Sequence, residues 1–309
     1  MAKIAADLTE LLTGLPRASV RESRGGPGRT DGRLLASGNG WTVEDVICSR
    51  GPDDRPFEER HDQFAIAIVT AGSFQYRGSG VAAGREMMAP GSLLLGNPGQ
   101  YFECGHEHAA GDRCLSFRYT PSHFERIVGG AAGRGQLRFT QLRLPLLRGL
   151  SPVVAHAHAA AEGSGEMSWE ELSVLLAVQA IQLDEGSASS SEPAAAAISR
   201  VTRAVRSIEE RVDEDLTLDE LARAAKLSPF HFLRRFKDLT GVTPHQYLMR
   251  TRLRRAAARL LVDREKILDV ALGSGFGDVS NFNRAFRAEF GVSPRTYRLK
   301  PNLSHRRAV

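Results

Sequence analysis

A short segment around residue 106 carries side chains that bind metals. Cys104, His106 and His108 alternate along a stretch whose pattern predicts a β-strand, and alternate residues of a strand point to the same face. If the chain turns back near Ala109, Cys114 on the return strand lies opposite Cys104 on that face. Two thiolates and two imidazoles that converge form a tetrahedral site for Zn²⁺ or for a thiophilic ion such as Cu(I).

The same residues fit two other chemistries. Histidines on the inner face of a small barrel also hydrogen-bond organic effectors, and a buried cysteine is commonly only a small hydrophobic side chain. Cys104 and Cys114 could instead act as a thiol pair that senses the redox state. His61 could line the same effector pocket from an adjoining strand, or simply begin that strand. Metal, organic effector and thiol chemistry all stay open at this point.

Motifs of the common enzyme classes are absent from the sequence. It contains no G-x-S-x-G, no H-E-x-x-H and no P-loop. Glu103 and Glu107 alternate away from the face that carries the histidines, so we expect no carboxylate ligand beside them. The sequence therefore favours a binding protein over an enzyme.

The last third of the chain contains a repeat with a constant offset of 50 residues. The two copies align without a gap, and such a repeat reveals the unit of architecture. The matched pairs are Phe232 and Phe282, Phe236 and Phe286, Gly241 and Gly291, Pro244 and Pro294, and Tyr247 and Tyr297. Each copy predicts a short helix, a turn and a second helix, which together make a helix-turn-helix unit.

Local signals mark the ends of these helices. Thr217 with Glu220 forms a capping box, and Ser228 and Asp278 have the N-cap position of the second helix in each unit. Gly241 and its repeat equivalent end those second helices. Because the two phenylalanines of each second helix are four residues apart, they are buried together, and the remaining side chains face outward.

The outward side chains of the second helices are the candidate DNA contacts. Those expected to contact base edges are Phe230, His231, Leu233 and Arg234 in the first unit and Val279, Ser280, Asn283 and Arg284 in the second. Lys237 and Arg287 are expected to bind phosphate. The helix between the units adds more candidate phosphate contacts, namely Arg250, Arg252, Arg254, Arg255 and Arg259.

Charge divides the chain in the same way. Residues 194–309 carry 23 Lys+Arg and 13 Asp+Glu, whereas residues 1–193 carry 18 and 23. A basic half with helix-turn-helix patterns, joined to an acidic half, is typical of a nucleic-acid-binding module attached to a second domain.

The repeat resembles the DNA-binding domain of the AraC/XylS family of transcriptional regulators. The signature GFxxxSxFxRxFxxxFGxSPxxYR is present as Gly275, Phe276, Ser280, Phe282, Arg284, Phe286, Phe290, Gly291, Ser293, Pro294, Tyr297 and Arg298. The resemblance implies that the protein binds double-stranded DNA, contacts RNA polymerase and acts as an activator.

The front half reads differently. From Trp41 to about residue 120, short strand patterns alternate with Gly and Pro turns, which suggests a small β-barrel or sandwich. This segment resembles the cupin-like sensing domain of the same family. Helical patterns follow, and the most apolar of them, Trp169 to Leu183, is a candidate dimerisation helix whose contact includes Leu176. The expected fold class is α+β, with a cupin-like barrel and helices followed by an all-α C-terminal domain with two helix-turn-helix units.

These patterns predict five segments. They are a poorly ordered segment 1–39, a sensing and dimerisation domain 40–185, a linker 186–197, a DNA-binding domain 198–300 and a tail 301–309. Three cysteines do not make a secreted disulfide framework, and no signal peptide or membrane-spanning run is recognisable, so a cytoplasmic location is expected.

The expected function is that of a homodimeric, sequence-specific transcriptional regulator whose front domain responds to a small effector, a metal or a redox signal. No cofactor is certain, and Zn²⁺ or Cu(I) are the candidates. The alternative is a metal-dependent cupin enzyme fused to a DNA-binding module.

Overall fold

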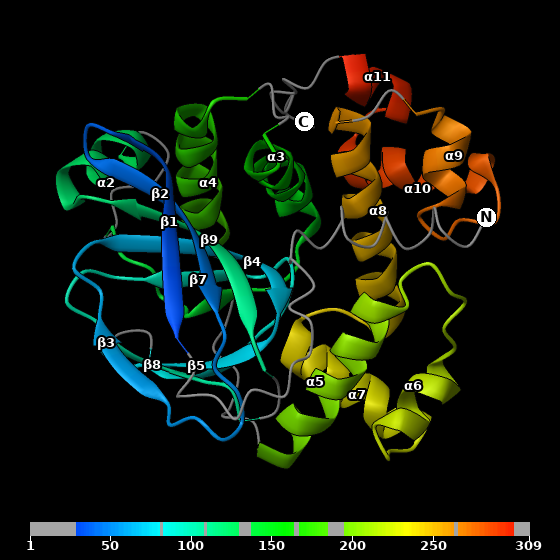
Figure 1. The fold of residues 1–309 in the computed structure, drawn as a ribbon, viewed down its shortest axis with the longest axis horizontal. Coiled ribbons are helices and arrows are strands. Elements are labelled where there is room, and N and C mark those ends of the chain that lie inside the picture. The colour runs from blue at the N-terminus through cyan, green and yellow to red at the C-terminus, as the bar shows by residue number, and fades with distance from the viewer. Residues whose placement is uncertain are drawn as a thin grey trace.

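The computed structural model describes residues 29–80, 83–107, 110–129, 137–163, 167–184, 195–262 and 265–299. A β-rich half is followed by a helical half, and Figure 1 shows the two halves side by side. No helix in these ranges is long and apolar enough to cross a membrane.

In the described part of the β-rich half there are ten strands. They are β1 (Thr30–Gly38), β2 (Trp41–Cys48), β3 (Phe57–Arg60), β4 (Phe64–Gly72), β5 (Phe74–Gly78), β6 (Gly84–Met88), β7 (Leu93–Gly96), β8 (Tyr101–Gly105), β9 (Asp112–Tyr119) and β10 (Arg143–Leu144). One sheet has the order β1-β2-β9-β4-β7-β10 and the other has the order β3-β8-β5-β6. Along β2, buried residues alternate with partly exposed ones, as expected for a strand with one face on the core.

The strands do not close into the expected barrel. Over the described residues, hydrogen bonding groups them into two separate sheets. The predicted hairpin between the segments of Cys104 and Cys114 is also wrong, because β8 pairs with β3 and β5 whereas β9 pairs with β2 and β4. The predicted poorly ordered segment 1–39 is too long, since β1 occupies Thr30–Gly38.

Three helices cover the larger sheet. They are α2 (Pro121–Val128), α3 (Ser151–Ala161) and α4 (Trp169–Asp184), and a short 3-10 turn spans Arg148–Leu150. Their apolar side chains join Ile66, Leu95 and Phe117 of the sheet in one core. Burial of this continuous apolar surface is the main force that holds helices and sheet together.

The helical half has the predicted repeat. Its helices are α5 (Ala195–Glu210), α6 (Leu218–Ala224), α7 (Pro229–Thr240), α8 (Pro244–Val262), α9 (Ile267–Leu272), α10 (Val279–Phe290) and α11 (Pro294–Leu299). Helices α6 and α7 form the first helix-turn-helix unit, α9 and α10 form the second, and α8 runs between them (Figure 1). The rest of the predicted poorly ordered segment, residues 186–194 of the predicted linker 186–197, and the predicted tail 301–309 lie outside the described ranges. The last residues of that linker form the start of α5.

The helix ends follow the local signals. The Thr217–Glu220 capping box is present in both directions, and Ser228 and Asp278 each accept a hydrogen bond from a backbone N–H of the first turn. Gly241 and Gly291 end α7 and α10 in the left-handed conformation, with φ of 80° and 77°. Glycine adopts this conformation without the steric cost of a Cβ.

Candidate functional site

Helix α7 presents a buried and an exposed face. Phe232 and Phe236 are fully buried with their ring centroids 5.5 Å apart, and they pack on Tyr247 of α8. This aromatic cluster fixes how α7 rotates about its axis. The predicted facing of the phenylalanine pair is confirmed.

The candidate DNA contacts of α7 lie on its other side. Phe230, His231, Arg234 and Lys237 are exposed, and Leu233 is partly buried. Phe230 is 70% exposed, and its ring centroid lies 5.7 Å from that of His231. His231 Nδ1 lies 2.8 Å from the hydroxyl of the N-cap residue Ser228, so the start of the helix orients its ring.

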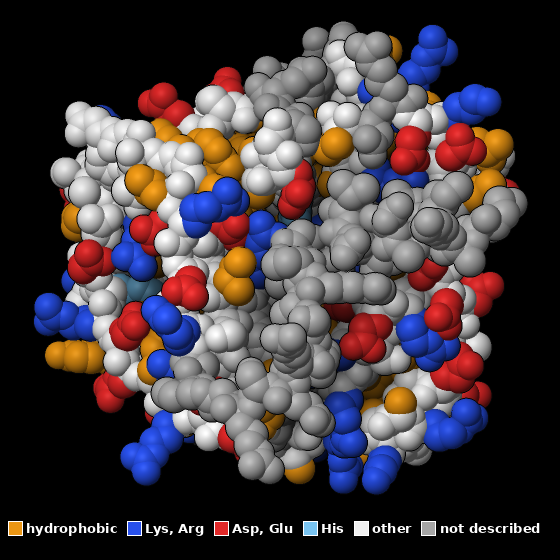
Figure 2. Space-filling view, in the orientation of Figure 1, with side chains coloured by type: hydrophobic (Ala, Val, Ile, Leu, Met, Phe, Trp, Pro, Cys, Tyr) orange, Lys and Arg blue, Asp and Glu red, His pale blue; other side chains and the backbone are white. Residues whose placement is uncertain are grey.

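Helix α10 repeats this arrangement. Phe282 and Phe286 are fully buried, and Phe276 and Tyr297 pack around them. The predicted contacts of this helix are Ser280, Asn283, Arg284 and Arg287, which are exposed, and Val279, which is partly buried. All ten candidate side chains therefore lie on accessible helix faces, while their contact with DNA stays a prediction. Figure 2 shows further Lys and Arg side chains over the part of the molecule where α5, α6 and α7 lie.

The arginines of α8 do not lie where a phosphate contact needs them. Arg252, Arg254 and Arg259 are at most 9% exposed. Arg252 donates to the backbone carbonyls of Val212 and Glu214, and Arg254 donates to the carbonyl of Pro90 in the β-rich half. A guanidinium that is buried and bonded in this way holds the protein together, so the expectation that these three arginines contact phosphates is wrong.

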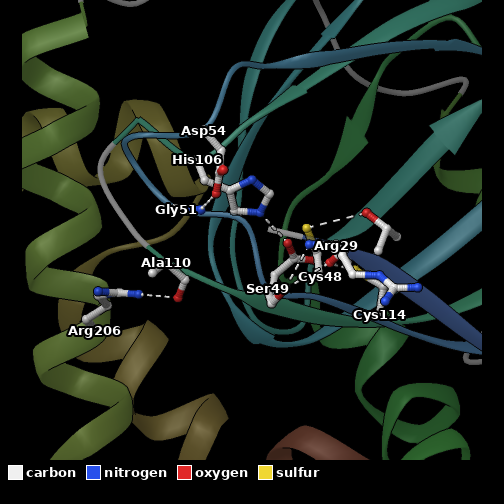
Figure 3. A network of polar contacts seen from close by, with 11 residues as sticks. Arg29, Cys48, Ser49, Gly51, Asp54, His106, Ala110, Cys114 and Arg206 are labelled. Carbon is white, nitrogen blue, oxygen red and sulfur yellow. Dashed lines mark hydrogen bonds and ion pairs between the residues drawn. The ribbon is translucent and has the colours of Figure 1, made fainter. Parts of the chain in front are cut away.

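The β-rich half contains a polar cluster that differs from the predicted one. Cys48 at the end of β2, His106 just after β8 and Asp112 at the start of β9 bring one sulfur, one ring nitrogen and one carboxylate oxygen within 4.8 Å of one another. His106 Nε2 lies 2.5 Å from Asp112 Oδ1. The side chains of His106 and Asp112 are 2% and 7% exposed. Figure 3 shows His106 pointing toward Cys48.

Hydrogen bonds within this cluster shift the pKa values of His106 and Cys48. Burial would lower the pKa of His106, but hydrogen bonds to Asp112 and Cys48 outweigh it and raise this pKa to about 9. Burial would raise the pKa of Cys48, but hydrogen bonds that involve His106, the backbone of Arg50 and Thr30 lower it. These hydrogen bonds favour the protonated form of His106 and the thiolate form of Cys48.

The other predicted ligands have different surroundings. Burial raises the pKa values of Cys104 and Cys114 well above that of a free thiol. Cys114 Sγ lies 3.5 Å from Asp112 Oδ2, next to the cluster, whereas Cys104 packs with Tyr76 in the apolar core of the smaller sheet. Both keep their thiols in a form that binds metal poorly. His108 lies outside the described residues.

His61 is held within the aromatic packing of the sheets. Its Nε2 lies 2.7 Å from the hydroxyl of Tyr76, and its ring stacks on Phe102 with centroids 4.2 Å apart. Burial lowers the pKa of His61 to about 4, so it is neutral at physiological pH. Its predicted place in an effector pocket stays a prediction.

Sequence reasoning missed Cys48 and Asp112. The expectation that no carboxylate joins the histidines considered only residues near them on one strand. Asp112 approaches His106 across the loop between β8 and β9, and Cys48 approaches from β2, which pairs with β9 so that Cys48 lies opposite Asp112. That register is the signal, and it depends on knowing which strands are neighbours.

Comparison with a family model covers part of the helical half. Residues 221–300 match a family model described as a helix-turn-helix domain. The right origin-binding protein of Escherichia coli K12 is 37% identical over 97 residues, which are 31% of this chain and 34% of that protein. The TetD protein of transposon Tn10 from Escherichia coli is 38% identical over 91 residues, which are 29% of this chain and 66% of TetD.

Solved structures also match part of the chain. A transcriptional regulator with an AraC-type DNA-binding domain from Chromobacterium violaceum is 28% identical, with a TM-score of 0.32, over 34% of this chain and 95% of that one. The chain spans about a third of the length of the right origin-binding protein that it matches.

Proposed function

From the premise that residues 221–300 are a helix-turn-helix domain of the AraC type, we propose that this protein is a DNA-binding transcriptional regulator. The observation that carries the proposal is the repeated arrangement of α7 and α10. Each is seated by two fully buried phenylalanines and turns its polar and basic side chains outward. Such a helix fits the major groove of B-DNA, which is about 12 Å wide.

The two units of one protomer read one DNA site. With α7 and α10 in successive major grooves on one face of the duplex, their contacts lie about one helical turn, ~10 bp, apart. Arg234 and Arg284 read base edges, and Lys237 and Arg287 bind phosphates. The bound regulator acts as an activator and contacts RNA polymerase, as the family resemblance implies.

The β-rich half acts as the sensing and dimerisation domain. A dimer would place two protomers on two copies of the site. Helix α4 supports this idea through the exposed side of its apolar sequence, where Leu175 is 40% exposed. Leu176, by contrast, is fully buried in the core of its own protomer, so the expectation that it forms the dimer contact is wrong.

An enzyme is the weaker interpretation. The relatives found by comparison carry the names of an origin-binding protein and a transposon protein, and family resemblance implies regulators. The cavity that borders His106 has a volume of about 10 Å³, which is room for about one water molecule and too small for an organic substrate.

A selection experiment tests the proposed function. Full-length protein is incubated with random duplexes, and the bound fraction is sequenced. A mobility-shift assay then compares binding to the enriched duplex with binding to the upstream region of the protein's own gene. We expect enrichment of two short motifs ~10 bp apart. We also expect the unlabelled enriched duplex to compete for the protein better than a scrambled duplex does. Uniform recovery of all sequences would contradict a sequence-specific regulator.

A further inference from the structure

Three metal-binding atoms of different chemistry meet between the ends of three strands. They are Cys48 Sγ, a ring nitrogen of His106 and a carboxylate oxygen of Asp112, all within 4.8 Å of one another. Cys48 is 5% exposed, and the side chains of His106 and Asp112 are nearly as buried. Polar and ionisable groups of this kind are costly to bury unless they have a partner. Their convergence at one buried point therefore requires an explanation.

The donor set identifies the kind of ligand. Thiolate, imidazole and carboxylate are all ligands of Zn²⁺, whereas Mg²⁺ and Ca²⁺ take oxygen and Cu(I) prefers sulfur. In a tetrahedral zinc site with bonds of about 2.0 to 2.3 Å, the ligand atoms lie roughly 3.3 to 3.8 Å apart. The three ligand atoms here lie within 4.8 Å of one another. A small side-chain rotation is enough to bring them to the spacing of a tetrahedral site. His106 and Asp112 would move slightly apart as the ion enters between them.

We infer that Cys48, His106 and Asp112 form a Zn²⁺ site, and that occupation of this site signals to the DNA-binding half. Three protein ligands leave a fourth position for water. The inferred site shares only His106 with the set expected from the sequence. Cys104 lies in the apolar core of the smaller sheet and does not belong to it.

The signal has a short physical path. His106 directly follows β8 and Asp112 begins β9, so one ligand lies at each of these strand ends. The backbone carbonyl of Ala110, two residues before Asp112, accepts a hydrogen bond from Arg206 Nη2 at 2.9 Å. Arg206 belongs to α5, the first helix of the helical half, and Figure 3 shows this contact beside the cluster.

A second contact joins the same two elements. Thr202 of α5 lines the small cavity that His106 borders. An ion that ties Asp112 to His106 would fix the backbone at Asp112 and, two residues before it, the carbonyl of Ala110 that Arg206 binds. Zn²⁺ shifts DNA affinity only by its differential affinity for the two arrangements of this backbone and α5. This second part of the inference rests on the proposed function, while Zn²⁺ binding itself does not.

Metal binding is tested on the full-length protein without DNA. Protein stripped with chelator is titrated with Zn²⁺ in competition with a chromophoric chelator, and with Co²⁺ as a spectroscopic substitute. We expect one ion per chain and a sulfur-to-cobalt charge-transfer band. Cys48→Ser should abolish that band. His106→Gln and Asp112→Asn should weaken Zn²⁺ binding ~100-fold or more, since even the loss of a supporting group outside the ligands costs 10- to 100-fold.

Cys104→Ser is the matched control, because it removes a thiol that is as buried as that of Cys48 and lies outside the cluster. Thermal melts of each variant show whether it is folded. Retention of the cobalt band in Cys48→Ser, or its loss in a folded Cys104→Ser, would overturn the assignment. So would a wild-type chain that binds no Zn²⁺.

The signal is tested separately with Arg206→Ala. We expect Zn²⁺ to change the affinity of the wild type for its selected duplex about 10-fold, and this change to disappear in Arg206→Ala while Zn²⁺ affinity is kept. An equal Zn²⁺ effect in both proteins would overturn the path through α5. A protein that binds Zn²⁺ but enriches no DNA sequence would contradict the proposed function and leave the metal site standing.

Discussion

At the scale of single residues, α7 and α10 divide their side chains between support and contact. Phe232 and Phe282 have no exposed surface, whereas the arginines two residues later are exposed. The division follows from helical geometry, because residues four apart share a face and residues two apart do not. Substitutions on the two faces should therefore have different consequences.

Replacement of Arg234 or Arg284 by alanine should weaken binding to the selected duplex by ~1 to 3 kcal/mol and relax one base position. A guanidinium that makes two hydrogen bonds to a guanine contributes both affinity and sequence preference. Titration with the selected duplex and with its single-base variants measures both effects. Arg235→Ala is the control, because Arg235 is exposed on the same helix and lies 4.0 Å from Asp238. An equal loss on every duplex would reassign the residue to phosphate contact.

Replacement of Phe232 or Phe282 by alanine should lower the free energy of unfolding by ~3 kcal/mol or more, because each removes a fully buried ring. Urea titration followed by circular dichroism measures this loss. Phe230→Ala should change stability by no more than ~0.5 kcal/mol, since its side chain is 70% exposed, although it should weaken DNA binding. A Phe232→Ala variant as stable as the wild type would mean that α7 is rotated from the orientation described.

At the scale of elements, the two units are copies in sequence that stand in different surroundings. Gly241 follows α7 and lies against Pro145 of the β-rich half, where an added Cβ would come within 2.5 Å of the proline ring. Gly291 follows α10 and has open space around the position of a Cβ. The first helix-turn-helix unit is therefore packed against the β-rich half at this glycine, whereas the equivalent glycine of the second unit has no neighbouring atom in the way of a Cβ.

The same substitution in the two glycines should separate backbone strain from this contact. Gly291→Ala should cost ~1 to 2 kcal/mol, because a residue with a Cβ is strained in the left-handed region. Gly241→Ala should cost more, since it adds a collision with Pro145 to the same strain. Urea unfolding of the two variants gives the difference directly. Equal losses of unfolding free energy in the two variants would show that Pro145 moves aside without an energetic cost.

At the scale of the whole molecule, α8 joins the two halves. It packs along α3, and Ala155 of α3 lies in the same apolar cluster as Leu253 and Ala257. Arg254 lies against Gly91, where any side chain would displace its guanidinium. Glu289 at the end of α10 lies near Arg148 and Arg250, at 3.4 and 3.6 Å, and also bonds to Ser151. Both helix-turn-helix units are thus attached to the β-rich half.

Assembly is the prediction that belongs to this scale. Leu175→Glu should convert a dimer into a monomer, because it places a charge in the exposed apolar face of α4. Light scattering, with and without DNA, measures the mass. Leu176→Glu is the contrasting variant, since its buried position predicts unfolding of the protomer and not a folded monomer. A wild-type protein that is monomeric with and without DNA would contradict the predicted dimer.

The sequence by itself determined the helical half. Caps, turn glycines and the spacing of phenylalanines act within one or two turns of a helix, so each unit can be recognised from about 30 residues, and the repeat confirms it. The exposed faces of α7 and α10 followed from the same spacing. Their role at DNA stays a prediction.

Only the tertiary structure decided which groups meet across the strands. An alternating pattern indicates which face of a strand is buried but not which strand lies beside it. The pairing of β8 with β3 and β5 could therefore not be predicted from the sequence. Whether Cys48 and Asp112 lie close to His106 depends on which strands pair. The burial of Arg252 and Arg254 likewise depends on backbone carbonyls from distant segments. A guanidinium can be buried only where hydrogen-bond acceptors are present.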